Sequence, residues 1–282
     1  VVSQKLKDFF DDPYNREFMA GITEVCDARG AGVSLISASD ERAAAWNIES
    51  AVVDGIILQC VEDGSRLVDL ARKRKIPFVS IDLDAGPDMG TIDVDHRGGA
   101  RMAAEHLLAL GRRRFAILAL ELIGDGQVGV VDRKRRWAAE DTVTRDRLLG
   151  YGDAFATAGM SIDDIPVVES FNDRRHAAEM AATLFSLVPD ATGLLAMSDG
   201  LARAAMKVAQ ESGRLVPRDL SIVGFDDIPE AAAARPALTT VHQPIVEKGR
   251  RAADMIFDSS RPRKEVLPLE LVVRASSGPA PG

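Results

Sequence analysis

Short runs of apolar and β-branched residues alternate with longer segments of helical periodicity along almost the whole chain. The short runs predict strands at residues 32–37, 54–58, 76–81, 114–119, 165–168, 193–197 and 220–224. The longer segments predict helices at residues 13–29, 64–75, 97–110, 145–158 and 201–212. This alternation is typical of parallel sheets with helices on both faces. Because the units are too numerous for one compact sheet, we expect an α/β fold of two Rossmann-like lobes.

Both ends of the chain depart from this pattern. Only residues 1–3 precede the polar stretch 4–12, so we expect the chain to be cut from a longer polypeptide. At the other end, residues 276–282 are rich in Ser, Gly and Pro and are predicted to be disordered. The first long helix is better defined, because Asp12 is a candidate N-cap, Pro13 begins the helix and Gly30 ends it.

Composition narrows the class of protein. The chain has 282 residues, of which 46% are hydrophobic and 28% charged, which suits two globular lobes. Its net charge of -8 repels phosphate backbones, so we expect no DNA-binding face in these residues. Cys26 and Cys60 are expected to be buried free thiols, which suit a reducing compartment. Since no leader and no apolar run of membrane length is found, we expect a cytoplasmic protein without membrane partners.

Several motifs are better explained by structure than by chemistry. Residues 124–129 match G-x-G-x-x-G, but no helix is predicted to begin at the third glycine, so we expect a loop. The basic clusters 72–75 and 112–114 end predicted helices, where cations complement the helix dipole. The cluster 133–136 is predicted to be a solvated loop, although it could reach an anionic effector. Trp137 beside it could cap a cleft or anchor the loop.

Catalytic and metal-binding signals are missing. The histidines have no ligand-like spacing with each other or with the cysteines, and neither a G-x-S-x-G elbow nor a P-loop occurs. We therefore expect no metal, no cofactor and no enzymatic activity. One candidate for ligand binding remains, because the strand at 220–224 brings Asp226 to the carboxyl end of a sheet, where ligands of α/β proteins bind. A carboxylate there can accept two sugar hydroxyls or pair with an amine.

Residues 216–244, VPRDLSIVGFDDIPEAAAARPALTTVHQP, carry the most specific resemblance to a known family. Further matching segments are DDPYNREFMAGI, VDHRGGARMAAEHLLALGRRRFAIL, TRDRLLGYGDAF and AMSDGLARAAMKVAQESG. Along nearly its whole length the chain resembles the lactose-repressor (LacI/GalR) family of transcription regulators. The resemblance implies a type I periplasmic-binding-protein-like fold with three crossovers, near residues 93–97, 241–245 and 267–270. Residues 1–94 with 244–266 would form the N-terminal lobe, and 95–243 with 267–282 the C-terminal lobe.

The resemblance also implies a function. The chain would be the effector-binding core of a ligand-responsive bacterial repressor, and the helix-turn-helix headpiece that binds operator DNA would be absent from it. Two copies would form a homodimer through apolar faces such as Leu201, Ala205 and Val208. A small polar effector would bind in the cleft between the lobes.

Carried over position by position, the resemblance assigns the effector contacts. Asp226 would accept hydroxyls or an amine, and Arg147 would donate a forked pair of hydrogen bonds. Tyr14, with Asn15 beside it, and Phe171 would form apolar or stacking walls of the cleft. Weaker effector contacts or cleft-lining positions would be Asp82, Ser198 and Gln243. Phe171 could instead belong to the core, and Arg147 to the surface.

The chain departs from the family between residues 120 and 144, where a Gly- and Arg-rich insert replaces a tight loop. Asp141 and Val143 do not offer the polar pair found in purine-sensing members, so a sugar or sugar-like polyol is the expected effector. Two rival classes stay open at this stage. A periplasmic sugar-binding protein of a transporter would share the architecture but work as a monomer, and an enzyme on a doubly wound fold would show turnover.

Overall fold

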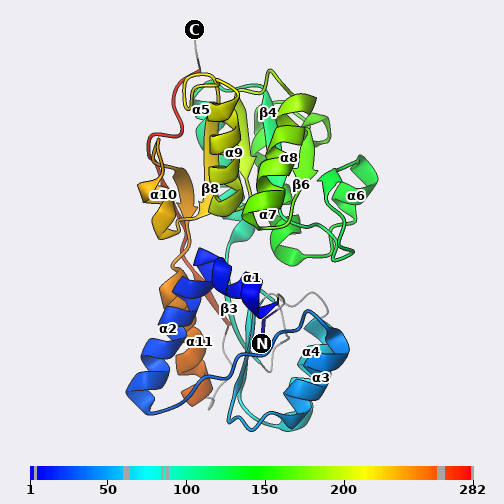
Figure 1. The fold of residues 1–282 in the computed structure, drawn as a ribbon, viewed down its shortest axis with the longest axis vertical. Coiled ribbons are helices and arrows are strands. Elements are labelled where there is room, and N and C mark those ends of the chain that lie inside the picture. The colour runs from blue at the N-terminus through cyan, green and yellow to red at the C-terminus, as the bar shows by residue number, and fades with distance from the viewer. Residues whose placement is uncertain (3–4, 60–63, 84–85, 87–88, 259–263, 281–282) are drawn as a thin grey trace. The chain divides into compact units, whose positions relative to one another are not determined.

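The computed structural model describes residues 1–2, 5–59, 64–83, 86, 89–258 and 264–280, so Cys60 lies outside the described residues. The chain folds as two compact units, which we call unit 1 (residues 1–94 and 244–268) and unit 2 (residues 95–243 and 269–282) (Figure 1). Each unit holds its own mostly parallel sheet with helices packed against it. The predicted α/β class with two lobes is therefore confirmed. Among the described residues, every helix is too short or too polar to cross a bilayer.

Unit 1 is built on a sheet in the order β1-β2-β3-β10, in which all neighbours run parallel. Its strands are β1 (Ile56–Gln59), β2 (Phe78–Ile81), β3 (Gly90–Val94) and β10 (Lys264–Leu267). Its helices are α1 (Leu6–Asp11), α2 (Pro13–Arg29), α3 (Glu41–Ser50), α4 (Gly64–Arg74) and α11 (Ile245–Phe257). The predicted ends of α2 are confirmed, because the Asp12 side chain accepts from the Tyr14 amide and Gly30 has a left-handed φ of 66°.

Helices α2 and α11 approach each other so closely that glycine is required at the contact. A Cβ atom on Gly21 would lie 2.0 Å from the Val246 carbonyl oxygen, and one on Gly249 would lie 2.2 Å from the Phe18 carbonyl oxygen. The predicted strand at 32–37 is wrong as a regular strand, since within it only Ser37 forms a bridge, to Val2. Val33 is exposed there, so the apolar run does not cover a core.

Unit 2 carries the larger sheet, in the order β11-β9-β8-β7-β4-β6-β5, with antiparallel pairs at both edges. Its strands are β4 (Phe115–Ala119), β5 (Gly129–Val130), β6 (Val167–Glu169), β7 (Gly193–Ala196), β8 (Ser221–Asp226), β9 (Thr239–His242) and β11 (Glu270–Val272). Its helices are α5 (His96–Ala109), α6 (Arg133–Trp137), α7 (Thr142–Thr157), the 3-10 turn η1 (Ile162–Asp164), α8 (Arg174–Leu187), α9 (Asp199–Glu211) and α10 (Pro229–Ala233). Every residue of β4, β7 and β8 is buried, as expected for parallel strands covered on both faces.

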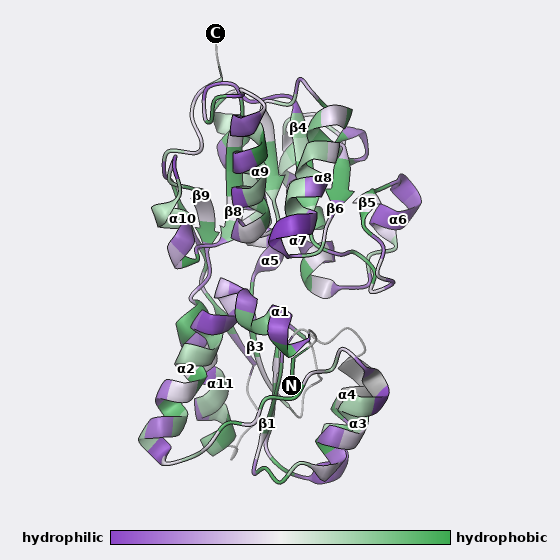
Figure 2. Ribbon diagram, in the orientation of Figure 1, coloured by the Kyte–Doolittle hydropathy of each residue, from purple (hydrophilic) through white to green (hydrophobic). Residues whose placement is uncertain are grey.

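Hydropathy follows this layering. Figure 2 shows hydrophobic colouring along β4 and β6, whereas α6 is mostly hydrophilic. Leu201 and Ala205 on α9 are fully buried inside unit 2. The prediction that these two side chains form a dimer face is therefore wrong, because they already pack within their own unit.

The C-terminal segment is ordered by contacts that its composition does not reveal. The Ser276 hydroxyl donates to the Ile222 carbonyl (2.6 Å) and accepts from the Thr239 amide (2.8 Å). Arg112 is fully buried and donates to the carbonyl groups of Pro217 (2.7 Å), Arg218 (3.3 Å), Gly278 (3.0 Å) and Pro279 (2.8 Å). The predicted disorder is thus wrong for residues 276–280, and residues 281–282 lie outside the described part. Arg112 thus joins residues 217–218 to residues 278–279. The prediction that Arg112 is a cation complementing a helix end is therefore wrong.

Replacing Arg112 by alanine should destabilise unit 2. The change leaves several buried carbonyl groups without a donor, so we expect a loss of about 3 kcal/mol or more in the free energy of unfolding. Chemical denaturation measures this loss. Arg113→Ala is the matched control, since this exposed neighbour should cost no more than about 0.5 kcal/mol. Equal stability of the two variants would contradict this role of Arg112.

Candidate functional site

The carboxyl ends of the parallel strands bring most of the predicted binding residues of unit 2 to one edge of the sheet. Asp226 is the last residue of β8, Ser198 follows β7, Phe171 follows β6 and Gln243 follows β9. Because these strands run parallel, their carboxyl ends lie on the same edge. Arg147 reaches this edge from α7.

Arg147 is the buried cation of the site, with a side chain that is 3% exposed. Its guanidinium donates to the Met197 carbonyl, lies 3.3 Å from Nδ1 of His96 and covers the Phe225 ring at 3.7 Å from the centroid. Within the described residues, its Nε atom is buried without a hydrogen-bond partner. The alternative that Arg147 is a surface residue is therefore wrong, and the side chain is held rigidly in place.

Asp226 is the matching anion. One carboxylate oxygen lies 3.7 Å from an Arg147 nitrogen and accepts a 2.7 Å hydrogen bond from the Gln243 side chain. The backbone turns sharply here, because Asp226 has a φ of 117° and Asp227 a φ of 58°. Asp227 is compensated separately, by Arg274 at 2.7 Å. The edge thus carries a fixed, charge-balanced pair of a guanidinium and a carboxylate.

Ser198 follows β7, the neighbour of β8, whereas Phe171 follows β6, which lies beyond β7 and β4 in the sheet. The Ser198 hydroxyl donates to the Asn172 side chain (2.7 Å) and caps α9 by accepting from the Leu201 amide. Phe171 is half-buried and contacts the His176 ring edge-on at 4.9 Å, and His176 is paired in turn with Asp173. Phe171 is therefore a supported aromatic side chain with part of its surface open to solvent, as a stacking wall requires.

Unit 1 holds a second buried polar cluster, which contains predicted residues together with Lys248 and Asp93, which were not predicted. Lys248 is fully buried and donates to both carboxylate oxygens of Asp82 at 2.8 Å. It also lies 3.3 Å from the Tyr14 hydroxyl. The Asn15 side chain accepts from Gln59 at 2.9 Å. Lys248 sits on the buried side of α11, so its charge needs the Asp82 carboxylate.

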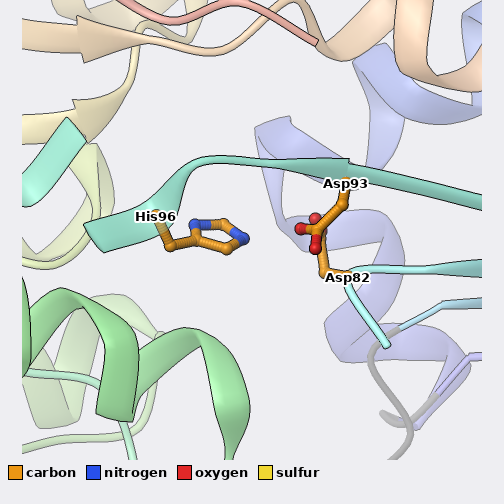
Figure 3. A group of neighbouring side chains, drawn as sticks. All are labelled: Asp82, Asp93 and His96. Carbon is orange, nitrogen blue, oxygen red and sulfur yellow. The ribbon is translucent and has the colours of Figure 1, made fainter. Parts of the chain in front are cut away.

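Asp93 completes this cluster, and its carboxyl group lies beside that of Asp82 (Figure 3). Burial, followed by the negative charge of Asp82, raises the pKa of Asp93 to about 6. When Asp93 is protonated, Lys248 and Asp82 balance each other. The cluster then offers donors and acceptors without net charge.

The insert between β4 and α7 is folded onto unit 2 by its arginines. Arg135 forms a two-pronged ion pair with Asp125 (2.7 and 2.9 Å) and a further one with Glu169. Arg136 is buried against the carbonyl groups of Ile162 and Ile165. The predicted solvated loop at 133–136 is therefore wrong, because these residues form α6 and anchor the insert. No helix begins at the glycine that starts β5, so the expectation of a loop at 124–129 is confirmed.

Trp137 anchors the insert as well. Its indole nitrogen donates to Asp163 at 3.0 Å, while 47% of the residue stays exposed. Of the two alternatives for this residue, the structure thus supports an anchor.

Comparison with known proteins finds relatives among the transcriptional regulators. The periplasmic binding protein-like domain family matches residues 104–277. The chain is 32% identical to the HTH-type transcriptional regulator Rv3575c of Mycobacterium tuberculosis, covering 99% of this chain and 79% of that protein. It is also 32% identical to the HTH-type transcriptional regulator IpsA of Corynebacterium glutamicum, covering 91% and 73% of the two chains.

Solved structures agree in fold. A LacI-family transcriptional regulator from Corynebacterium glutamicum superimposes with a TM-score of 0.87 at 28% identity, covering 98% of this chain and 84% of the other. The transcriptional regulator CelR in complex with cellobiose superimposes with a TM-score of 0.83 at 26% identity, covering 98% and 83%.

The raised pKa of Asp93 predicts how stability depends on pH. A carboxyl group that holds its proton more tightly in the folded state makes the free energy of unfolding fall as pH rises from 3.8 to about 6. Asp93→Asn should remove this fall and stabilise the protein at pH 7, by up to about 3 kcal/mol. Urea unfolding from pH 4 to 7.5 measures both effects. The exposed Asp190→Asn serves as control, and an identical pH profile of Asp93→Asn and wild type would contradict the assignment.

Proposed function

Because this chain belongs to the LacI/GalR (lactose-repressor) family of transcription regulators, we propose that it is the effector-sensing and dimerising core of a repressor. The effector that we propose is an uncharged sugar or a sugar-like polyol. Operator DNA would be bound through a helix-turn-helix headpiece that is not among these 282 residues. We place the protein in the cytoplasm, where a regulator meets its operator, and expect no turnover of the effector.

The charge-balanced pair of Arg147 and Asp226 is the observation that carries this proposal. A carboxylate can accept hydrogen bonds from two hydroxyl groups, and a guanidinium can donate two in a fixed fork. Since each charge is already compensated by the other, an ionic ligand would leave one charge unbalanced at the edge of unit 2. A neutral polyol makes the same hydrogen bonds without that cost. Phe171 adds an apolar surface on which the C–H face of a sugar ring can stack.

Further observations favour a sugar over a purine. The Asp141 side chain caps α7 by accepting from the Thr144 amide at 2.7 Å, and Val143 is apolar. These positions therefore offer no polar pair to a purine base. The CelR regulator, whose fold this chain shares, is known as a cellobiose complex. In unit 1, we propose Tyr14, Asn15 and Asp82 as further effector contacts, supported by the balanced charges of Asp82 and Lys248.

In such a regulator the effector acts by binding two conformational states with different affinity. An effector that favours the state with low affinity for DNA must itself bind less tightly when DNA is bound, because the coupling is reciprocal. A sensing core of this kind needs no catalytic group. The alternative of a transporter's periplasmic binding protein is disfavoured by the relatives, which are transcriptional regulators.

Thermal-shift screening tests the ligand class. Cellobiose, D-ribose and D-glucose are compared with gluconate and adenine, and a neutral sugar should raise the melting temperature by mass action. Asp226→Asn keeps the shape but removes the charge, so affinity for that sugar should fall about 30-fold or more by calorimetry. Asp190→Asn, on the exposed surface, should bind as wild type does. A hit with adenine alone, or full affinity of Asp226→Asn, would contradict the proposal.

The proposed homodimer has a separate test. The chain has a mass of 30.3 kDa, so sedimentation velocity at micromolar concentration should show a particle of about twice that mass. A persistent monomer would favour the transporter alternative. Leu201→Ala should not dissociate the dimer except by unfolding, since this side chain is buried within unit 2.

A further inference from the structure

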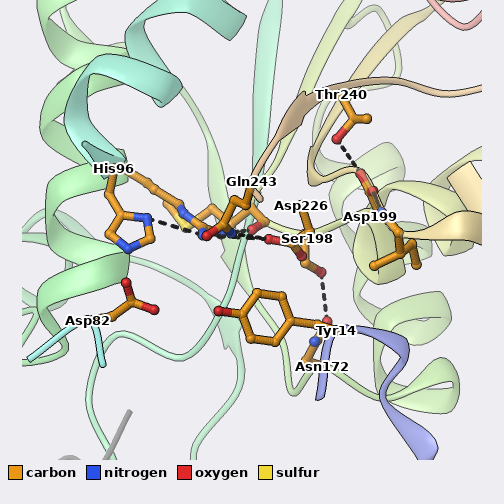
Figure 4. A network of polar contacts seen from close by, with 12 residues as sticks. Tyr14, Asp82, His96, Asn172, Ser198, Asp199, Asp226, Thr240 and Gln243 are labelled. Atoms are coloured by element: carbon orange, nitrogen blue, oxygen red, sulfur yellow. Dashed lines mark hydrogen bonds and ion pairs between the residues drawn. The ribbon is translucent and has the colours of Figure 1, made fainter. Parts of the chain in front are cut away.

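Asp199 is a fully buried carboxyl group on the first turn of α9. One of its oxygens accepts from the Thr240 hydroxyl at 2.6 Å, and the other accepts from the Ile228 amide at 3.0 Å (Figure 4). A single side chain therefore ties together α9, β9 and the turn that follows β8. Nothing in the proposed effector contacts uses this group.

The turn that Asp199 holds is conformationally costly. Asp226 and Asp227 both have positive φ angles, 117° and 58°, which side chains other than glycine rarely adopt. Such a backbone persists only when surrounding contacts fix it. The Gln243 amide fixes the near side by donating to the Asp226 carbonyl at 3.2 Å. On the other side of the turn, the fully buried Asp199 carboxyl group accepts from the Ile228 amide.

Gly224 shows how tightly the carboxyl group fits under the strand. A Cβ atom at this position would lie 2.3 Å from an Asp199 oxygen. Only glycine leaves room for that oxygen, two residues before Asp226. The chain thus makes space for Asp199 at the strand that carries the effector-binding carboxylate.

We propose that Asp199 is a positioning residue for Asp226, which sets effector affinity by holding the turn at residues 226–228 without touching the effector. The proposal rests on the proposed function, because it takes Asp226 as an effector contact. Asp199 locks the turn so that the Asp226 carboxylate stays beside Arg147 and Gln243. Freed from Asp199, the turn relaxes toward ordinary backbone angles and the carboxylate leaves that position.

The groups that face the Asp199 side chain decide which substitution preserves its role. Burial, and then the negative charge of Asp226, raise the pKa of Asp199 well above its ordinary value. The Thr240 hydroxyl donates to Asp199 in this structure, and a hydroxyl oxygen can also accept a hydrogen bond, while the Ile228 amide can only donate. Asparagine has one donor and one acceptor in the same places, so Asp199→Asn should keep both contacts, whereas Asp199→Ala loses them.

Thr240→Val tests the proposal without removing the carboxyl group, in case Asp199→Ala fails to fold. Its matched control is Thr239→Val, since Thr239 is also fully buried on β9 and loses hydrogen bonds to Arg274 and Ser277 instead. In the ligand-free protein, hydrogen exchange of the Ile228 amide should speed up about tenfold or more in Thr240→Val and Asp199→Ala. It should match wild type in Thr239→Val, Thr240→Ser and Asp199→Asn.

Calorimetry with cellobiose and D-ribose measures how the same substitutions change the affinity for sugar. Affinity for the sugar that binds should fall about tenfold in Thr240→Val but not in Thr239→Val or Thr240→Ser. Unchanged exchange at Ile228 in Thr240→Val and Asp199→Ala overturns the proposal, as does an equal loss of affinity in both valine variants. Binding of neither sugar by wild type contradicts the proposed ligand class instead, and the exchange rates then decide alone whether Asp199 holds the turn.

Discussion

A buried charge must be compensated where it lies, and this constraint shapes both polar clusters of the protein. Unit 2 pairs Arg147 with Asp226, and unit 1 pairs Lys248 with Asp82. Removing either partner would leave an isolated charge out of water, at a cost of about 3–5 kcal/mol. Each pair is therefore fixed in place before any effector arrives. In unit 2, this pre-arranged set of donors and acceptors with no net charge suits a neutral polar ligand.

Such a site is costly to build, and the rest of unit 2 stabilises it. The backbone at Asp226 adopts an angle that the residue would not choose by itself, and buried charges add to this cost. The apolar central strands β4 and β7 offset these free-energy costs. Buried contacts, such as those of Arg112 with the C-terminal segment, do so as well. The edge that carries Arg147 and Asp226 thus departs locally from ordinary backbone and burial rules, and a conventional core stabilises it.

Sequence reasoning succeeded where the signal is local. Alternating apolar runs predicted the helices α2, α4, α5, α7 and α9 and the strands β1, β2, β4, β6, β7 and β8. The strand predicted to end at Gly224 also placed Asp226 at the carboxyl edge of a sheet. It failed where partners are far apart in the chain, as for Arg112 with residues 278–279 or Asp199 with Thr240. The tail was misjudged because its Ser, Gly and Pro content reports local freedom but not the strands that cover it.

One missed residue did leave a signal. On α11 the buried positions Ile245, Ala252 and Met255 recur at helical spacing, and Lys248 lies on the same stripe. A lysine on an apolar stripe has to meet a counter-charge, so the sequence already required an acid opposite it. Which of the 43 acidic residues this would be could not be deduced, because the choice depends on how β2 and α11 pack in three dimensions.

Phe171 and the Arg147–Asp226 pair of unit 2 are held in place by different contacts. Phe171 follows β6, whose last residue, Glu169, binds Arg135 of the insert and the Leu122 amide. The Arg147–Asp226 pair is held instead by Met197, by Gln243 and by the turn at residues 226–228, which contacts Asp199. Because these two sets share no residue, a change in the insert that keeps the Asp141 cap of α7 should leave the charged pair undisturbed. On the function proposed above, variation in the insert would change the surroundings of Phe171 while the positions of Arg147 and Asp226 stay the same.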